Sequence, residues 1–555
     1  MNNKEIANQF SLLSSLMDIH GENSFRTKTY SIAAYKISKL TVDLYTLSEE
    51  NVFKINGIGE AIGKKILGIL STGKMKILED LILKTPEGIL EMLNIKGIGP
   101  KKIALIWKEM GIESIGELLY ACNENRLMLY KGFGKKTQDN VTESIEFYLS
   151  RKGSFLFAQA ERTAVNLLTF LQQLFSSEEI KITGDFSRHA ETVDTLEYVI
   201  PTSDQTITEK MTGLNDFDFL EKNSDHLLYK HNSGIKIKLY HTPQAALSKK
   251  VFETTGSAEF TTAFKNDYPA IDFQKAGNDQ GIFDQAGIQY IPPFLRENKA
   301  IISLAAENKI PEVIQPGDIK GIIHSHSKWS DGINTLEELA AACIKSGKEY
   351  LVISDHSKSA AYANGLTEDR IQAQHELIEK LNKTLSPFKI FKSIESDILN
   401  DGNLDYSNSI LSTFDLVIAS VHSNLKMNEE KAMMRLLKAI ENPYTTILGH
   451  MTGRLLLSRK GFPVNHTKII DACAANHVVI EINAHPRRLD MRWQWIDYAL
   501  SKNILLSIDP DAHSIPEFEN TRYGVLVAQK GMATSKDNLS SFSLKEFEDF
   551  LSSNH

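Results

Sequence analysis

The C-terminal part of the chain alternates between short apolar runs and stretches with helical spacing. Apolar residues recur at helical intervals in 335–347 and 430–440, which lie between such runs. A near-continuous apolar run is typical of a strand buried on both faces, and an intervening helix makes successive strands parallel. We therefore predict a parallel α/β barrel. Its seven predicted strands cover 321–326, 350–356, 390–395, 416–422, 446–450, 478–483 and 504–509.

Each of these runs ends in polar side chains of the kinds that bind metal ions. In a parallel barrel the carboxyl ends of all strands meet at one mouth, so we expect these side chains to gather there. A single histidine in such a place is most often structural. Histidines and carboxylates at six or more strand ends instead predict a multinuclear site for manganese, zinc or iron, because so many buried polar groups are costly without a cation.

The first 150 residues show helical periodicity interrupted by a repeated Gly-x-Gly turn, with lysines in the helix predicted after each turn. Glycine lets the backbone approach a ligand closely, and a helix N-terminus offers N–H groups to a phosphate. We predict helix-hairpin-helix motifs that bind the DNA backbone without reading its sequence; simple helix-capping turns are the alternative. The candidate DNA-binding residues are Gly57, Gly59, Lys64, Lys65, Gly97, Gly99, Lys101, Lys102, Gly132 and Gly134.

Composition narrows the class of protein. The 555 residues are too many for one core, and 42% of them are hydrophobic and 24% charged, as in ordinary globular proteins. The net charge of -8 argues against polyanion binding by the whole surface but not by local basic patches. The start of the chain lacks the apolar core of a signal peptide, so we expect a cytoplasmic protein, and we expect a monomer. Without CxxC spacing, we expect Cys122, Cys343 and Cys473 to fill cores.

Several motifs resemble the bacterial family X DNA polymerases that are fused to a polymerase and histidinol phosphatase (PHP) domain. Gly21-Glu-Asn-Ser-Phe-Arg26 is similar to their N-terminal domain, whereas His324-Ser-His326 and Asp511-Ala-His513 resemble PHP motifs. The resemblance implies a helical helix-hairpin-helix domain, a polymerase-like α+β core and a distorted (β/α)7 barrel. The implied domains are 1–85 and 86–150 with helix-hairpin-helix motifs, a palm at 151–245, a thumb-like part at 246–300, a linker at 301–316 and the barrel at 317–555.

The resemblance also implies the chemistry of the barrel. A site of nine ligands fits three metal ions, with the Glu395 carboxylate as a bridge between two of them. The implied metal is manganese (Mn²⁺), with zinc or iron as alternatives. The implied ligands are His324, His326, Asp331, His356, Glu395, His422, His450, Asp511 and His513. Among them, the implied catalytic set is His324, His326, Glu395, Asp511 and His513. Candidates for binding substrate phosphates, or for ordinary solvated rim residues, are Lys358, Arg454, Arg459 and Asn483.

The polymerase-like part departs from the family where the chemistry would occur. Aligned on Glu191-Thr-Val193, the two metal-binding aspartates are replaced by Thr195 and Glu197, and a third by Lys238. A lysine puts positive charge where two-metal nucleotidyl transfer needs a cation, so we predict that polymerase activity is lost. In some members of the family a lysine after the first hairpin forms a Schiff base with an abasic sugar. Lys65 occupies that place, but a phosphate contact or a solvated helix lysine is the favoured interpretation.

The family resemblance implies a manganese-dependent 3'-5' exonuclease in DNA repair, with 3'-phosphatase or abasic-site endonuclease action as variants. Three alternatives stay open. The first is a phosphatase acting on a small phosphomonoester, the second a DNA-binding scaffold with a silent metal site, and the third a polymerase with residual activity. The repeated hairpins disfavour the first, the intact ligand set the second, and Lys238 the third.

Overall fold

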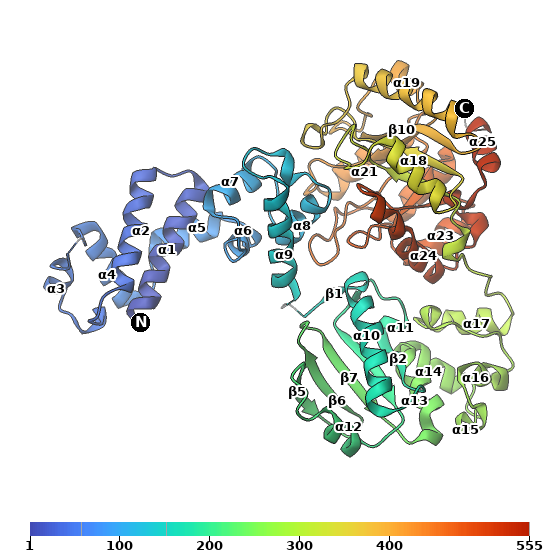
Figure 1. Ribbon diagram of the computed structural model, residues 1–555, viewed down its shortest axis with the longest axis horizontal. Helices are drawn as coiled ribbons and strands as arrows, with labels where there is room; N and C mark the ends of the chain where they lie inside the picture. The colour runs from blue at the N-terminus through green and yellow to red at the C-terminus, as the bar shows by residue number, and fades with distance from the viewer. Residues whose placement is uncertain (57, 151–152, 554–555) are drawn as a thin grey trace. The chain divides into compact units, whose positions relative to one another are not determined.

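The computed structural model describes residues 1–56, 58–150 and 153–553, and the chain divides into two compact units (Figure 1). The first comprises Met1–Asn123 and Tyr130–Tyr148, and the second comprises Glu124–Leu129 and Leu149–His555. The short segment Glu124–Leu129 therefore belongs to a different unit from the helices that flank it in sequence. No helix in the described ranges is long and apolar enough to span a membrane.

The first unit is helical. Its longest antiparallel pair packs α1 (Asn3–His20) against α2 (Ser24–Ser38), with Ile6, Phe10 and Leu13 of α1 fully buried. A capping box between Asn2 and Glu5 starts α1. The remaining helices are α3 (Glu49–Phe53), α4 (Glu60–Thr72), α5 (Lys76–Lys84), α6 (Glu87–Met92), α7 (Pro100–Lys108), α8 (Ile115–Asn123) and α9 (Lys135–Ser150).

The polymerase-like part of the second unit is a five-stranded sheet in the order β2-β4-β7-β6-β5. Its strands are β2 (Lys181–Thr183), β4 (Thr195–Ile200), β5 (Phe217–Lys222), β6 (His226–His231) and β7 (Lys236–His241). Helix α10 (Phe157–Phe175) packs on it through Ala160, Ala164 and Leu171, and the central strands β4 and β7 are parallel.

Five helices follow the sheet and enclose a core rich in aromatic rings. They are α13 (Leu247–Thr255), α14 (Ala258–Asp267), α15 (Phe273–Ala276), α16 (Asp279–Ala286) and α17 (Ala300–Ala306). Part of the stretch 301–316, predicted as a linker, is in fact helical and packed: Ile301, Ile302 and Ala305 of α17 join Phe252 and Phe283 in this core. The apolar spacing of these three residues supplies the buried face. The domain boundaries themselves stay predictions.

The C-terminal part is the predicted barrel of seven parallel strands, in the order β14-β13-β12-β11-β10-β9-β8. A parallel bridge between Ser325 and Ala512 links its two end strands. The strands are β8 (Gly321–Ser325), β9 (Tyr350–Ile353), β10 (Lys389–Asp397), β11 (Leu416–Ser420), β12 (Ile447–Leu448), β13 (Val479–Asn483) and β14 (Leu506–Asp509). The covering helices are α18 (Leu336–Lys345), α19 (Glu368–Leu385), α20 (Asn408–Leu411), α21 (Glu429–Ile440), α22 (His466–Asn476), α23 (Ile496–Ser501) and α24 (Thr521–Lys530).

Alternate strand residues explain why both faces of the barrel wall are apolar. Ile322 packs outward with Leu336 and Leu339 of α18, whereas its neighbour Ile323 packs inward with Phe547 of α25 (Leu544–Ser553). A side chain from α25 thus helps to fill the end of the barrel opposite the predicted metal site. Cys122, Cys343 and Cys473 are buried, as predicted.

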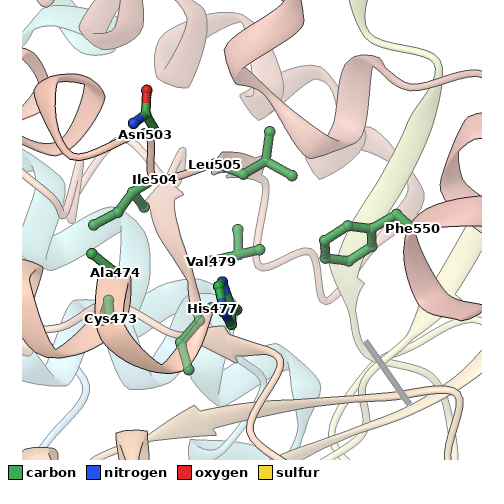
Figure 2. Close-up of a pocket in the computed structure, with 9 residues that line it drawn as sticks. Cys473, Ala474, His477, Val479, Asn503, Ile504, Leu505 and Phe550 are labelled. Atoms are coloured by element: carbon green, nitrogen blue, oxygen red, sulfur yellow. The ribbon is translucent and has the colours of Figure 1, made fainter. Parts of the chain in front are cut away.

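A cavity of about 170 Å³ lies at the amino ends of β13 and β14. Figure 2 shows Val479, Leu505 and Phe550 around it, with Cys473 on α22. Because the predicted ligands follow the carboxyl ends of the strands, this cavity is separate from the predicted metal site.

Candidate metal centre and nucleic-acid interface

The carboxyl ends of the barrel strands bring all nine predicted ligands together. His324 lies in β8, Glu395 in β10, and the other seven follow the strands in loops. Eight of them are buried, and His422 is partly buried. Their ligand atoms form three overlapping groups, each within 4.8 Å: His326, Asp331, His356 and His513; His324, His326 and Asp511; and His356, Glu395 and His422.

Glu395 lies at the centre of the cluster. One of its carboxylate oxygens lies 2.9 Å from His450 Nε2 and 3.2 Å from His422 Nε2. Its other oxygen lies 2.9 Å from His356 Nδ1. A carboxylate with histidines on both oxygens is placed to share its oxygens between two cations. The contact between Glu395 and His450 Nε2 also joins His450, which is outside the three groups, to the cluster.

Two predicted ligands have unusual backbone conformations. His324 and Asp511 both have positive φ, 58° and 51° respectively. Such conformations cost about 1–3 kcal/mol each for residues other than glycine and persist where the surroundings determine them. At His324 the register between β8 and β9 shifts by a bulge between Ile322 and Ser325, which redirects the side chain at the strand end.

The donor atoms fit cations because many of them lie close to other members of the cluster without forming hydrogen bonds. Within the described ranges, His326 makes no hydrogen bond through either ring nitrogen, and neither does His356. The same holds for His324 Nε2, Asp331 Oδ2 and His513 Nε2. Buried polar atoms without partners destabilise a fold by about 1–3 kcal/mol each, so their concentration in one pocket fits a site that binds positively charged ions.

A second set of carboxylates orients the histidines, and our sequence reasoning did not assign them this role. Glu481 in β13 accepts from the Nδ1 side of the His324 ring, and its other oxygen accepts the backbone N–H of His450 at 2.5 Å. Asp397 lies 2.5 Å from His422 Nδ1. Contacts of this kind fix which nitrogen faces the metal. The position of Glu481 on an apolar strand that ends at the mouth was the available sequence signal.

The charges in the pocket favour ionised carboxylates. Burial opposes ionisation, but neighbouring histidines, His422 first among them, hold the pKa of Glu395 well below its ordinary value. Against the same effect of burial, His356 and His513 lower the pKa of Asp331. Burial disfavours the charged imidazole, yet Asp331 raises the pKa of His513 to about 10. A bound cation would have to displace these protons from the histidines.

The predicted substrate-binding residues differ in their surroundings. Arg454 is buried, and its guanidinium pairs with Glu191 of the polymerase-like part at 2.7 Å. Lys358 pairs with Glu368 at 2.7 Å, and Arg459 donates to the Gly453 carbonyl. These contacts give the three cations structural partners, and their roles in phosphate binding stay predictions. Asn483 lies inside the cluster, where its amide donates to Asp511 at 3.1 Å and to Glu481 at 3.2 Å.

The polymerase-like site is arranged very differently. Thr195 and Glu197 lie on β4, and the register with β7 places Glu197 beside Lys238. The Lys238 ammonium lies 3.7 Å from the Glu197 carboxylate, which also accepts a hydrogen bond from the Tyr240 hydroxyl at 2.8 Å. The replacements inferred from the sequence are therefore neighbours, and the Glu197 carboxylate already has internal partners.

Among the hairpin residues, Gly57 lies outside the described residues. Gly59 and Gly99 are the N-caps of α4 and α7, with φ of -75° and -99°. A Cβ atom at either position would contact nothing, so neither backbone conformation nor internal packing requires glycine there. Open space before a helix N-terminus is what close approach by a phosphate needs. Lys101 is exposed beside Gly99, as Lys64 is in the first turns of α4.

The other hairpin residues occupy similar places. Gly97 and Gly132 adopt positive φ, 92° and 95°, in the turns before α7 and α9, and Gly134 directly precedes α9. Lys102 lies over the Phe133 ring at 5.1 Å. Lys65 lies 5.7 Å from the centre of the Tyr30 ring. Whether Lys65 contacts phosphates or acts on abasic sugars stays a prediction.

Comparison with known proteins agrees with this arrangement. A helix-hairpin-helix domain family matches residues 1–75, and a SAM-like helix-hairpin-helix tandem matches residues 89–146. A Bacillus subtilis (strain 168) protein named DNA polymerase/3'-5' exonuclease PolX is 30% identical over the whole of both chains.

Shorter matches are to proteins named as phosphatases. A "probable phosphatase" of Thermoanaerobacter sp. (strain X514) is 28% identical over 166 residues, which is 29% of this chain and 62% of that protein. Another, from Caldanaerobacter subterraneus, is 26% identical and covers 29% of this chain and 60% of its own length.

The full-length relative, the helix-hairpin-helix matches and the seven-stranded parallel barrel with its buried histidine and carboxylate cluster agree with one another. Helix-hairpin-helix domains in a chain of this kind indicate DNA binding, and the relatives' names indicate phosphoester hydrolysis. The chain therefore belongs to the bacterial family X DNA polymerases that carry a C-terminal PHP domain.

Proposed function

We propose that the protein is a manganese-dependent 3'-5' DNA exonuclease that acts in DNA repair. The observation that carries the proposal is the cluster of nine predicted ligands around Glu395, in which several ring nitrogens and carboxylate oxygens form no hydrogen bond with the described residues. Divalent cations, when bound, supply a nucleophilic water at neutral pH and neutralise charge on phosphate oxygens. Glu395 would be shared between cations, while Glu481 and Asp397 keep His324 and His422 correctly oriented.

The first unit would hold the DNA substrate. The open backbone before α4 and α7 and the lysines beside it suit binding to phosphates of any sequence. This combination favours a polymeric substrate and, together with the full-length relative that is named an exonuclease, distinguishes the proposal from a phosphatase acting on small molecules.

We further propose that the polymerase activity is lost. A divalent cation at Glu197 would have to displace the Lys238 ammonium, which pairs with this carboxylate, and the Tyr240 hydroxyl, which donates a hydrogen bond to it. Positions 195 and 238 carry a threonine and a lysine, so they supply no carboxylate that would offset the cost of this displacement.

A second candidate function is hydrolysis of small phosphomonoesters, favoured by the relatives named probable phosphatases. Incubation with a 5'-labelled primer-template, manganese and all four deoxynucleotides separates the candidates. We expect a ladder of shortened primers that His324→Ala does not produce. An unshortened primer combined with hydrolysis of p-nitrophenyl phosphate would favour the second function, and primer extension would contradict the loss of polymerase activity.

A further inference from the structure

A segment from between two predicted hairpins lies at the rim of the metal centre. Glu124–Leu129 joins α8 to α9 along the chain but belongs to the unit that contains the barrel. The Asn125 side-chain amide donates to the backbone carbonyl of Asp331 at 3.4 Å, and Asp331 is one of the predicted ligands. The barrel mouth therefore includes residues that lie about two hundred positions earlier in the sequence.

Paired charges hold this segment in place. The Glu124 carboxylate is buried and lies 2.7 Å from Arg126 Nε and 3.9 Å from the Arg488 guanidinium. Nε of Arg488 lies in turn 3.5 Å from Asp511, another predicted ligand. A buried charge is stable only when it is paired, so Glu124 links Arg126 to the ligand shell through Arg488.

Arg126 presents its guanidinium beside an aromatic ring of the mouth. Its Cζ atom lies 4.4 Å from the centre of the Tyr362 ring, and its side chain is 18% exposed. The Tyr362 ring is 6.4 Å from that of the predicted ligand His356. The Tyr362 hydroxyl is buried and makes no hydrogen bond to any described residue. A buried hydroxyl in such a place is an available donor, and leaving it without a partner is costly.

We propose that Arg126 and Tyr362 bind the non-bridging oxygens of the substrate phosphate at the metal centre. The guanidinium suits two oxygens of one phosphate, and the Tyr362 hydroxyl donates to a third acceptor. The inference rests on the proposed function and adds two substrate-binding residues to it. Neither belongs to the predicted ligand set, and what favours Arg126 is its place beside the Tyr362 ring at the metal centre, where Glu124 holds it through Nε.

The position of Arg126 also bears on the kind of substrate. The segment that contains Arg126 lies between the second and third Gly-x-Gly turns. The predicted DNA-binding region and a residue proposed to bind the substrate phosphate are therefore parts of one continuous stretch of chain. We therefore expect Arg126 to matter for a DNA strand and for a small phosphodiester alike, because it contacts the phosphate that is cleaved and not a distant one.

The test compares Arg126→Ala, Arg126→Lys and Tyr362→Phe with the wild type. The control is Lys389→Ala, since Lys389 pairs with Glu548 at the opposite end of the barrel. We expect Arg126→Ala to lower kcat/KM about 30-fold on labelled primer and on bis(p-nitrophenyl) phosphate, mainly through KM. Arg126→Lys keeps the charge but not the planar fork and should lose less. Tyr362→Phe, which keeps the ring, should lose about threefold to tenfold.

Manganese content, measured by mass spectrometry, and Tm are followed in every variant. Unchanged manganese with raised KM supports the proposal, because a phosphate ligand is not a metal ligand. Wild-type kcat/KM in both Arg126→Ala and Tyr362→Phe would overturn it. Loss of manganese from Arg126→Ala would also overturn it, since the residue would then act by supporting Asp331 and Asp511.

The outcome can be separated from that of the proposed function. If the wild type leaves DNA intact but cleaves bis(p-nitrophenyl) phosphate, the exonuclease proposal fails and the variants still decide on the small substrate. If neither is cleaved, calorimetric titration of inorganic phosphate into the manganese-loaded protein decides. Weaker phosphate binding by Arg126→Ala then supports the inference, and equal binding contradicts it.

Discussion

The barrel mouth and the polymerase-like sheet each present acidic side chains at positions where the sequence resemblance implied metal sites, but the surroundings of those side chains are opposite in kind. In the barrel, Glu395 is surrounded by histidine nitrogens, several of which form no hydrogen bond with the described residues. In the sheet, Glu197 pairs with the Lys238 ammonium and accepts a hydrogen bond from the Tyr240 hydroxyl. The comparison teaches that a site's capacity for cations depends on which partners its donors already have, and not on acidity alone.

The largest expected effect comes from the centre of the cluster. Glu395→Gln keeps the shape of the side chain but removes the charge that two cations would share, so we expect exonuclease activity to fall by about a thousandfold or more. The activity assay on labelled primer measures this. The matched change in the other region, Glu197→Gln, should leave exonuclease activity within about twofold; a large loss in that variant would break the comparison.

A smaller effect is expected from the carboxylates that orient the ligands. Glu481→Gln removes the acceptor that fixes the His324 ring, and we expect metal affinity to weaken by about 10- to 100-fold. Calorimetric titration of manganese into metal-free protein measures the change. Affinity equal to that of the wild type would show that Glu481 does not position His324.

The hairpins should affect DNA affinity without affecting the chemistry. Replacing both Lys101 and Lys102 with alanine removes two predicted phosphate contacts, so we expect the slope of log affinity against log salt to become shallower by about two. Fluorescence anisotropy with labelled DNA measures it, with Lys389→Ala/Lys545→Ala as a control of equal charge change. An unchanged slope would favour capping turns over DNA-binding hairpins. Hydrolysis of bis(p-nitrophenyl) phosphate should stay at the wild-type rate.

The smallest effect concerns stability of the polymerase-like part against acid. Burial, and secondarily Lys530, lowers the pKa of His189 from 6.5 to about 4. At a pH between these two values, the unfolded chain binds a proton that the folded chain does not. The contribution of neutral His189 to the free energy of unfolding is therefore complete above pH 6.5 and lost as the pH falls towards 4. Its full size is about 3 kcal/mol. Denaturant unfolding should show a weaker pH dependence in His189→Gln, and identical dependence would contradict a neutral, buried His189.

Much of the barrel was predictable from sequence because its strands are buried on both faces. Each apolar run ends in a polar cluster, and the carboxyl ends of parallel strands meet, so the proximity of His324, Glu395 and His513 follows from local pattern and topology. The helical part of 301–316, which the family resemblance implied to be a linker, was missed for the opposite reason, because Ile301 and Ile302 find their partners only in the tertiary core.

Contacts between distant segments could not be predicted in this way. Nothing near Arg126 in the sequence indicates that its guanidinium lies over Tyr362, more than two hundred residues later. Likewise, Arg454 at the barrel rim resembled a phosphate ligand, whereas its partner Glu191 comes from the polymerase-like part. Such pairs depend on how whole elements pack, which hydrophobic periodicity does not specify.

The most direct test of the account is where manganese binds. Anomalous diffraction from crystals grown with Mn²⁺ measures the positions of bound ions throughout the molecule. The account predicts anomalous peaks among the nine ligands around Glu395 and none between Glu197 and Lys238. A peak at Glu197, or a barrel mouth without manganese, would contradict it.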